Sequence, residues 1–178
     1  IPLRLVGSEM CIRDRSIIVQ KYGGTSIGTI DKISKVADKV ISEKNNGNSL
    51  VVVVSAMSGE TNRLLNLAKS INPDISGREL DTLISTGEQV TISLLAMTLI
   101  KKGHKAISLT GSQAGIFTDD IFNKARIDYI NNLPIKKYLD LGNIVVVAGF
   151  QGITKEGDIT TLGRGGSVSY THLRAHET

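Results

Sequence analysis

Glycine-rich segments beside cationic side chains are the parts of this sequence best suited to do chemistry. Lys21 stands just before a Gly-Gly-Thr-Ser run at 23–26, and Arg164 lies within a second glycine cluster at 163–166. Backbone N–H groups in such loops bind phosphate or carboxylate oxygens, because no side chain blocks their approach. Lysine and arginine side chains offset further negative charge. The pattern predicts a site for an anionic ligand.

Other kinds of active site have little support. The Walker motif G-x-x-x-x-G-K-[ST] is absent, and the glycines at 163–166 do not satisfy G-x-G-x-x-G, which disfavours a dinucleotide-binding module. Cys11 is the only cysteine, and two of the three histidines lie near the C-terminus. The sequence therefore offers few residues for histidine-dependent catalysis or for a metal site held by the protein. Charge stabilisation remains, which is what phosphoryl transfer needs most.

The composition is that of a globular chain. Its 178 residues are 40% hydrophobic and 4% aromatic, with a net charge of +4 and no block of like charges. We therefore expect one domain and no nucleic-acid partner. Uninterrupted apolar runs such as 50–54 are far shorter than the roughly 20 residues of a membrane-spanning helix, and the first residues lack the apolar centre of a secretory signal. We expect no membrane partner and a cytoplasmic location, which the single cysteine fits.

Strands and helices alternate along the sequence. Short runs rich in β-branched residues predict strands at 17–21, 50–54, 106–110 and 144–148, with a short edge strand at 126–130. Apolar residues at helical spacing predict helices at 30–41, 64–68, 89–102 and 134–141. This alternation implies a three-layer α/β/α fold with a mainly parallel sheet and right-handed crossovers.

The strand ends are where a ligand would bind in such a sheet. Four of them pair glycine with hydroxyl or amide side chains, at 21–26, 55–59, 110–115 and 149–152. Turns alone do not need so many donors. We therefore expect these four ends to converge on one site.

Taken in order, these segments resemble the aspartokinases of the amino-acid kinase superfamily. The resemblance is carried by KYGGTSIG at 21–28, VVSAMSGETNRL at 53–64, STGEQV at 85–90, SLTGSQAGI at 108–116, and GFQG at 149–152 with TTLGRGGS at 160–167. It implies a carbamate kinase-like fold and transfer of the ATP γ-phosphate to the β-carboxylate of L-aspartate, the first step towards lysine, threonine and methionine. ATP would enter with Mg²⁺ bridging its phosphates, and no metal would be held by the protein.

The resemblance also implies residue roles on the phosphate side. Lys21 would neutralise charge on the transferred phosphoryl group as the catalytic residue. Gly23, Gly24 and Thr25 would lie at the ATP phosphates, where glycine gives the N–H groups close access.

On the amino-acid side, the implied residues are Ser55, Thr61, Glu88, Phe150, Arg164 and Ser167. Arg164 would bind the α-carboxylate and Glu88 the ammonium group, while the three hydroxyls would donate to carboxylates and Phe150 would lie against the substrate backbone. Plainer interpretations stay open: Glu88 as a glutamate in the first turn of a helix, the hydroxyls as helix or turn caps, and Phe150 as a core residue.

The resemblance stops near both ends. Val168 follows Ser167 where the family has an aspartate, and the family's adenine-binding half and regulatory domains have no counterpart in this sequence. We interpret 16–167 as a truncated N-terminal portion of the kinase domain, and 1–15 and 168–178 as artefactual tails of translated sequencing adaptor. The chain alone is therefore expected to have little or no kinase activity, whereas the complete enzyme is expected to be a homo-oligomer. A catalytically silent fragment and another amino-acid kinase, such as a glutamate kinase, are the alternatives.

Overall fold

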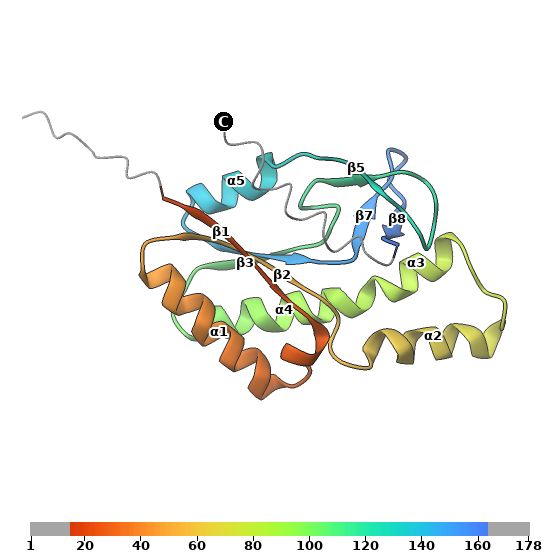
Figure 1. The fold of residues 1–178 in the computed structure, drawn as a ribbon, viewed down its shortest axis with the longest axis horizontal. Helices are drawn as coiled ribbons and strands as arrows, with labels where there is room; N and C mark the ends of the chain where they lie inside the picture. The colour runs from red at the N-terminus through yellow and green to blue at the C-terminus, as the bar shows by residue number, and fades with distance from the viewer. Residues whose placement is uncertain (1–14, 164–178) are drawn as a thin grey trace, which may run out of the picture.

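A four-stranded parallel sheet forms the middle layer of the fold (Figure 1). The computed structural model describes residues 15–163. The strands lie in the order β1 (Ile17–Tyr22), β2 (Ser49–Val54), β6 (Ile144–Ala148) and β3 (Ala106–Leu109). All neighbouring pairs are parallel. The central strands β2 and β6 are buried throughout, which explains their runs of valine without polar alternation.

Two long helices, α1 (Ile30–Asn45) and α4 (Thr86–Lys101), cover one face of this sheet. The Thr29 hydroxyl caps the start of α1 by accepting a hydrogen bond from the Lys32 N–H at 3.2 Å. Their shared core consists of Ile33, Val36, Val40, Ile92, Leu95 and Leu99 packed on Leu50, Val52 and Val54. Helix α4 is therefore fixed against the strands whose ends carry the glycine-rich segments.

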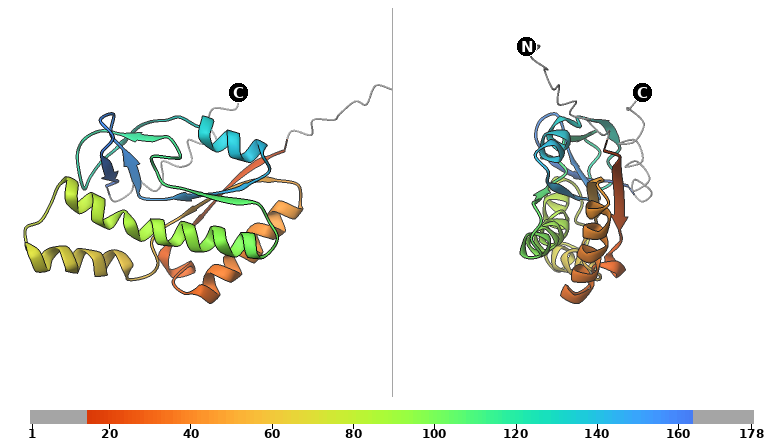
Figure 2. Two further views of the ribbon diagram at one scale, coloured as in Figure 1. Left: turned by 180° about the vertical axis from the view of Figure 1, so that it is seen from behind. Right: turned by 90° about the vertical axis from the view of Figure 1, so that its left-hand side faces the viewer.

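The opposite face is covered by helix α5 (Leu133–Asp140) and by a second, smaller sheet (Figure 2). This sheet has the order β5 (Ile127–Ile130), β4 (Ile116–Thr118), β7 (Gln151–Ile153) and β8 (Ile159–Thr161). Strands β4 and β7 are parallel, whereas the β4–β5 and β7–β8 pairs are antiparallel. The three layers expected from the sequence are thus present.

Helices α2 (Glu60–Ile71) and α3 (Arg78–Ile84) pack together through Leu64, Ala68, Leu80 and Ile84. Helix α3 continues almost directly into α4. Among the described residues, the 24-residue run Arg78–Lys101 is long and apolar enough to cross a membrane, although polar residues interrupt its apolar ones. Half of its apolar window is buried inside the structure, and α4 packs on α1 and the sheet, so we interpret it as a core helix.

The structure confirms the five predicted strands and four predicted helices, with different bounds. The largest difference is at α2, which spans Glu60–Ile71 instead of 64–68. The helices and strands that the sequence did not predict are α3, β4, β7 and β8, together with the short 3-10 helix η1 (Gly24–Ser26). Each of these strands has only three residues, too few to show a period of two, and α3 has seven. Segment 149–152, predicted as a loop, therefore includes the start of β7.

Candidate active site

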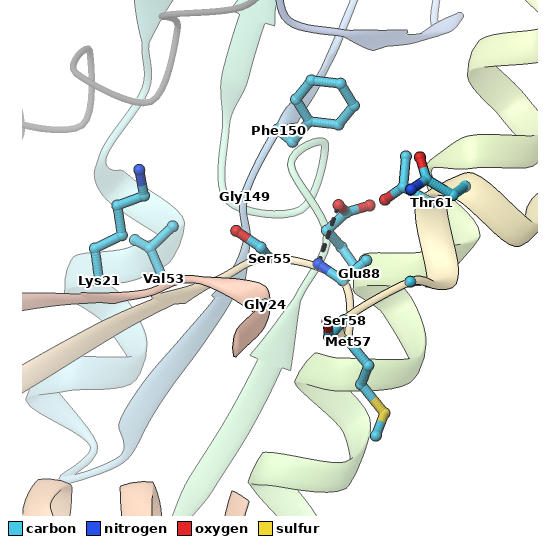
Figure 3. A pocket seen from close by; sticks show the side chains of 13 residues that line it. Lys21, Gly24, Val53, Ser55, Met57, Ser58, Thr61, Glu88, Gly149 and Phe150 are labelled. Atoms are coloured by element: carbon cyan, nitrogen blue, oxygen red, sulfur yellow. Dashed lines mark hydrogen bonds between the residues drawn. The ribbon is translucent and has the colours of Figure 1, made fainter. Parts of the chain in front are cut away.

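The carboxyl ends of β1, β2 and β6 open onto a cavity of about 370 Å³ (Figure 3). Predicted residues that line it are Lys21, Gly24, Ser55, Thr61, Glu88 and Phe150. They come from segments up to 129 positions apart in the sequence, from Lys21 to Phe150. Convergence of three glycine-rich strand ends agrees with the site expected beyond the carboxyl edge of a parallel sheet.

Lys21 supplies positive charge at one side of the cavity. Its side chain is exposed, and it lies on the opposite side of Ser55 from the Glu88 carboxylate (Figure 3). None of the ion pairs found between residues 15 and 163 involves Lys21. Its ammonium group is therefore available to an anionic ligand.

Gly24 lets the loop after β1 lie directly against the loop after β2. A Cβ atom at this position would lie 2.8 Å from the Ala56 carbonyl oxygen, so any other residue would push the two loops apart. Gly23 has open space around it, and neither Gly23 nor Thr25 lines the cavity. Thr25 instead accepts a hydrogen bond from Lys32 Nζ through its carbonyl oxygen at 2.9 Å. Of the predicted phosphate-side residues, Lys21 and Gly24 are the two that reach the cavity.

Ser55 and Thr61 come from the segment that joins β2 to α2. Ser55 directly follows β2, where its N–H donates to the Tyr22 carbonyl at 3.2 Å. Gly59 has a φ of +82°, a left-handed conformation that turns the chain into α2 and places Thr61 in the first turn of that helix. The N-terminal end of α2 therefore faces the cavity with its partial positive charge, which suits a carboxylate or phosphate.

Glu88 is the most unusual group in the cavity, because it is a carboxylate that is only 2% exposed. Its Oε1 accepts a hydrogen bond from the Ala56 N–H at 3.2 Å, while its buried Oε2 has no partner within the described residues. Burial raises the pKa of Glu88 to about 7, although the nearby backbone N–H groups of residues 88 and 56 and the Gln151 side chain oppose the rise. A ligand ammonium group would supply the missing donor and restore the carboxylate charge.

Phe150 enters the cavity from the end of β6. Its φ of +65° is rare for a residue with a Cβ, and its carbonyl oxygen accepts from the Leu162 N–H at 2.9 Å. The next residue, Gln151, is 2% exposed and donates through Nε2 to the Ser85 carbonyl at 3.0 Å. These contacts hold the third strand end to the start of α4, where Glu88 lies.

The fourth glycine-rich segment, 110–115, is absent from the cavity lining, which corrects the expectation that all four converge. Strand β3 is an edge strand beside β6, one position away from the cavity. A Cβ at Gly111 would lie 2.4 Å from the Gln151 carbonyl oxygen, and one at Gly115 would lie 2.2 Å from that of Asn131. These glycines therefore permit close packing of backbone segments.

Two predicted residues, Arg164 and Ser167, lie outside the described residues. Three lining residues, Met57, Ser58 and Asn62, were given no role from the sequence, although all belong to the segment that resembles the aspartokinases. Asn62 follows Thr61 in the first turn of α2. A lining residue at 61 therefore already indicated that its neighbour in the same turn could also face the cavity. Between residues 15 and 163, no three His, Cys, Asp or Glu side chains are grouped to hold a metal ion.

Comparison with known proteins identifies the family. The amino acid kinase family matches residues 16–173. Aspartokinase from Geobacillus stearothermophilus is 60% identical over 151 residues, which are 85% of this chain and 37% of that protein. Aspartokinase 2 of Bacillus subtilis is 54% identical, again over 85% of this chain and 37% of its own length. The chain thus spans little more than a third of these relatives.

Solved structures agree with this result. Aspartate kinase from Synechocystis has a TM-score of 0.73 and 46% identity, over 85% of this chain and 24% of that one. Escherichia coli aspartokinase III in complex with aspartate and ADP has a TM-score of 0.71 and 26% identity, over 86% of this chain and 44% of its own. The family match, the relatives and the fold lead to one conclusion: this chain belongs to the amino acid kinase family.

Proposed function

We propose that this chain supplies the amino-acid-binding and phosphoryl-stabilising part of an aspartate kinase. The observation that carries the proposal is the joint lining of one cavity by Lys21 and by Glu88, a cation and a carboxylate with an unpartnered oxygen. Aspartokinases at 50–60% identity support aspartate as the substrate, as does the similar structure that contains aspartate and ADP.

In this proposal, the residues act on the substrate in distinct ways. Glu88 Oε2 accepts from the aspartate ammonium group, and the hydroxyls of Ser55 and Thr61 donate to its carboxylates. Arg164 and Ser167 add donors from the segment that follows β8, and Phe150 lies against the substrate backbone. Together they would fix the aspartate β-carboxylate so that its reactive oxygen faces the nucleotide.

Lys21 acts on the transferred group. A β-carboxylate oxygen forms a bond to the γ-phosphorus while the bond from that phosphorus to the bridging oxygen of ADP breaks, giving aspartyl phosphate and ADP. Negative charge on the three equatorial phosphoryl oxygens faces Lys21 and the backbone near Gly24. Mg²⁺ would enter with the ATP phosphates and offset charge there, and no residue of this chain is assigned to hold it. A cytoplasmic location, the absence of a membrane partner and a homo-oligomeric complete enzyme remain predictions.

Binding to the 178-residue chain tests the amino-acid part of this proposal. Calorimetric titration should show binding of L-aspartate at least tenfold tighter than that of L-glutamate. Ser55→Ala should weaken the aspartate affinity several-fold. Equal affinities for aspartate and glutamate, or binding of neither, would contradict the proposal.

The catalytic part is tested on the product of the complete open reading frame that contains this chain. Lys21→Ala should slow ATP-dependent formation of aspartyl hydroxamate at least 100-fold, because one charge opposite the transferring phosphoryl group is lost. Lys32→Ala is the matched control, since its amine contacts the same glycine segment at Thr25 and does not line the cavity. A similar loss in both variants would contradict the role of Lys21.

A further inference from the structure

We propose that Asp81 is a positioning residue for the amino-acid site, although it does not line the cavity. This inference rests on the proposed function. Asp81 lies in α3 and is 0% exposed. We infer that it holds the strand leading into the Arg164 segment at a fixed place relative to the helix that carries Glu88.

Four hydrogen-bond donors from two distant segments converge on the Asp81 carboxylate. The Asn123 N–H and the Thr161 N–H donate to Oδ2, each at 2.9 Å. The Asn123 side-chain amide and the Thr161 hydroxyl donate to Oδ1. These donors lie 42 and 80 positions away in the sequence. A single side chain thus joins α3, the loop around residue 123 and strand β8.

The chemistry of these contacts requires a carboxylate. All four partners act as donors towards Asp81, and both carboxylate oxygens are acceptors with room for two hydrogen bonds each. An asparagine would replace one oxygen by an NH₂ group, which would then face donors. Asn123 itself has a φ of +66° and is also bonded to Gly77 through its side chain, with its Oδ1 accepting from the Gly77 N–H at 2.7 Å. The loop at residue 123 is therefore held in one conformation.

Strand β8, which the Asp81 carboxylate contacts, leads to residues that are bonded to Phe150 of the cavity. After Thr161, the Leu162 N–H donates to the Phe150 carbonyl at 2.9 Å, and the Gly163 N–H donates to the Ala125 carbonyl at 3.2 Å. Arg164 follows Gly163 directly in the sequence. The Asp81 anchor therefore holds the strand that is bonded to Phe150, up to Gly163, and we propose that Arg164 depends on this strand for its position.

The backbone of Asp81 is also connected, through Ser85, to the helix that carries Glu88, the residue predicted to bind the ammonium group. The Ser85 N–H donates to the Asp81 carbonyl at 3.0 Å, and the Ser85 carbonyl accepts from Gln151 at 3.0 Å. Glu88 is in the first turn of the helix that starts there. The backbone of residue 81 thus joins the start of the helix that carries Glu88, while its carboxylate joins the strand that is bonded to Phe150.

Amide hydrogen exchange on the 178-residue chain tests the anchor without any substrate. Thr161→Val removes one donor and keeps the side-chain shape, and Thr161→Ser keeps the donor. Thr161→Val should speed exchange at Leu162 and Gly163 at least tenfold with α1 unchanged, and Thr161→Ser should leave both as in the wild type. Asp158→Asn is the matched control, since it removes only an exposed 2.6 Å ion pair from α3 to the β7–β8 hairpin. Two outcomes would overturn the anchoring role of Asp81. One is faster exchange throughout the chain in Thr161→Val, and the other is faster exchange at Leu162 and Gly163 in Asp158→Asn.

Calorimetry with L-aspartate tests the coupling to the site. Thr161→Val should raise the aspartate Kd about fivefold at unchanged stoichiometry, and Asp81→Asn should raise it more, whereas Thr161→Ser should restore it. A role limited to folding would lower the binding stoichiometry and leave the Kd of the folded fraction unchanged, which would overturn the coupling even if Asp81→Asn does not fold. Wild-type chain that binds no aspartate would overturn the proposed function and with it the coupling, while the exchange result would still decide the anchor.

Discussion

Two buried carboxylates seven positions apart on one helical run have opposite surroundings. Asp81 is 0% exposed and Glu88 is 2% exposed. Asp81 accepts hydrogen bonds from Asn123 and Thr161, each of which donates twice. Glu88 accepts one hydrogen bond through Oε1, and its Oε2 has no partner within the described residues. The two side chains are almost equally buried, but they differ in the number of hydrogen-bond donors that surround them.

This difference separates a group that holds the fold from a group that awaits a ligand. Removing a carboxylate from water costs several kcal/mol unless donors replace the lost water. At Asp81 the protein supplies these donors, so the cost is offset in the folded chain itself. At Glu88 the cost favours the protonated form until a cation binds, and Glu88 lines the cavity that such a ligand would occupy. Unsatisfied burial at the end of a parallel sheet is therefore the stronger sign of a binding residue.

Replacing Asp81 by its amide should have the largest effect on the stability of the chain. Asp81→Asn turns an acceptor towards donors and should lower the free energy of unfolding by about 3 kcal/mol. Urea unfolding followed by circular dichroism at pH 7.5 measures it. Asp158→Asn, which breaks the exposed Arg78 pair, should cost under about 1 kcal/mol. Equal losses in the two variants would contradict the anchoring role.

Glu88 should make the chain less stable as the pH rises. Its ordinary pKa is 4.5 and burial raises it to about 7 in the folded chain. Between these values the folded chain binds more protons than the unfolded chain, so the free energy of unfolding falls with increasing pH. From pH 5 to pH 8 this amounts to about 2–3 kcal/mol, at about 1.4 kcal/mol for each tenfold change in proton affinity.

Glu88→Gln is the control for this pH dependence. The variant has no carboxylate to titrate at position 88, so its urea midpoint should fall much less between pH 5 and pH 8. Parallel pH profiles for wild type and variant would rule out a raised pKa at Glu88.

In free-energy terms, the effect of Glu88→Gln on aspartate binding should be somewhat smaller than the pH effect on stability. Loss of the charge opposite the substrate ammonium group should raise the aspartate Kd by about 10- to 100-fold, or about 1.4–2.7 kcal/mol. Calorimetry at pH 7.5 measures it. The affinity for succinate, which has two carboxylates and no ammonium group, should not fall in this variant. A parallel loss of succinate affinity would assign Glu88 a role in packing alone.

Much of the fold could be predicted from the sequence, because the parallel strands are fully buried and their valine runs report that burial directly. The smaller sheet could not. Its strands β4, β7 and β8 gain their partners from segments far apart in the chain, so the three residues of each carry no local pattern. The anchor at Asp81 was not predicted for the same reason, because its donors lie 42 and 80 positions away.

Part of the cavity lining was predicted, and the roles of its residues remain predictions. Lys21, Ser55, Thr61, Glu88 and Phe150 do line one cavity. Segment 110–115 has the same glycine-rich composition as 21–26 and does not line it, although both segments follow edge strands of the sheet. Gly111 and Gly115 instead lie against the backbones of Gln151 and Asn131. Strand order is a tertiary property, and composition cannot separate a glycine that admits a ligand from one that admits a neighbouring backbone. Spacing likewise did not distinguish Gly24, which contacts the second loop, from Gly23, which has open space.

Glycine substitutions should give the smallest effects and extend the comparison from the two carboxylates to their surroundings. Gly77 has a φ of +91° and bonds to Asn123 next to Asp81, so Gly77→Ala should cost about 1 kcal/mol of stability through backbone strain. Gly24→Ala should instead weaken aspartate binding a few-fold, because its Cβ would displace the Ala56 carbonyl and with it the N–H bonded to Glu88. Gly23→Ala, in open space, is the control for both. Urea unfolding and aspartate calorimetry on the three variants measure this, and a Gly77→Ala variant that loses affinity at full stability would reverse the assignment of the two regions.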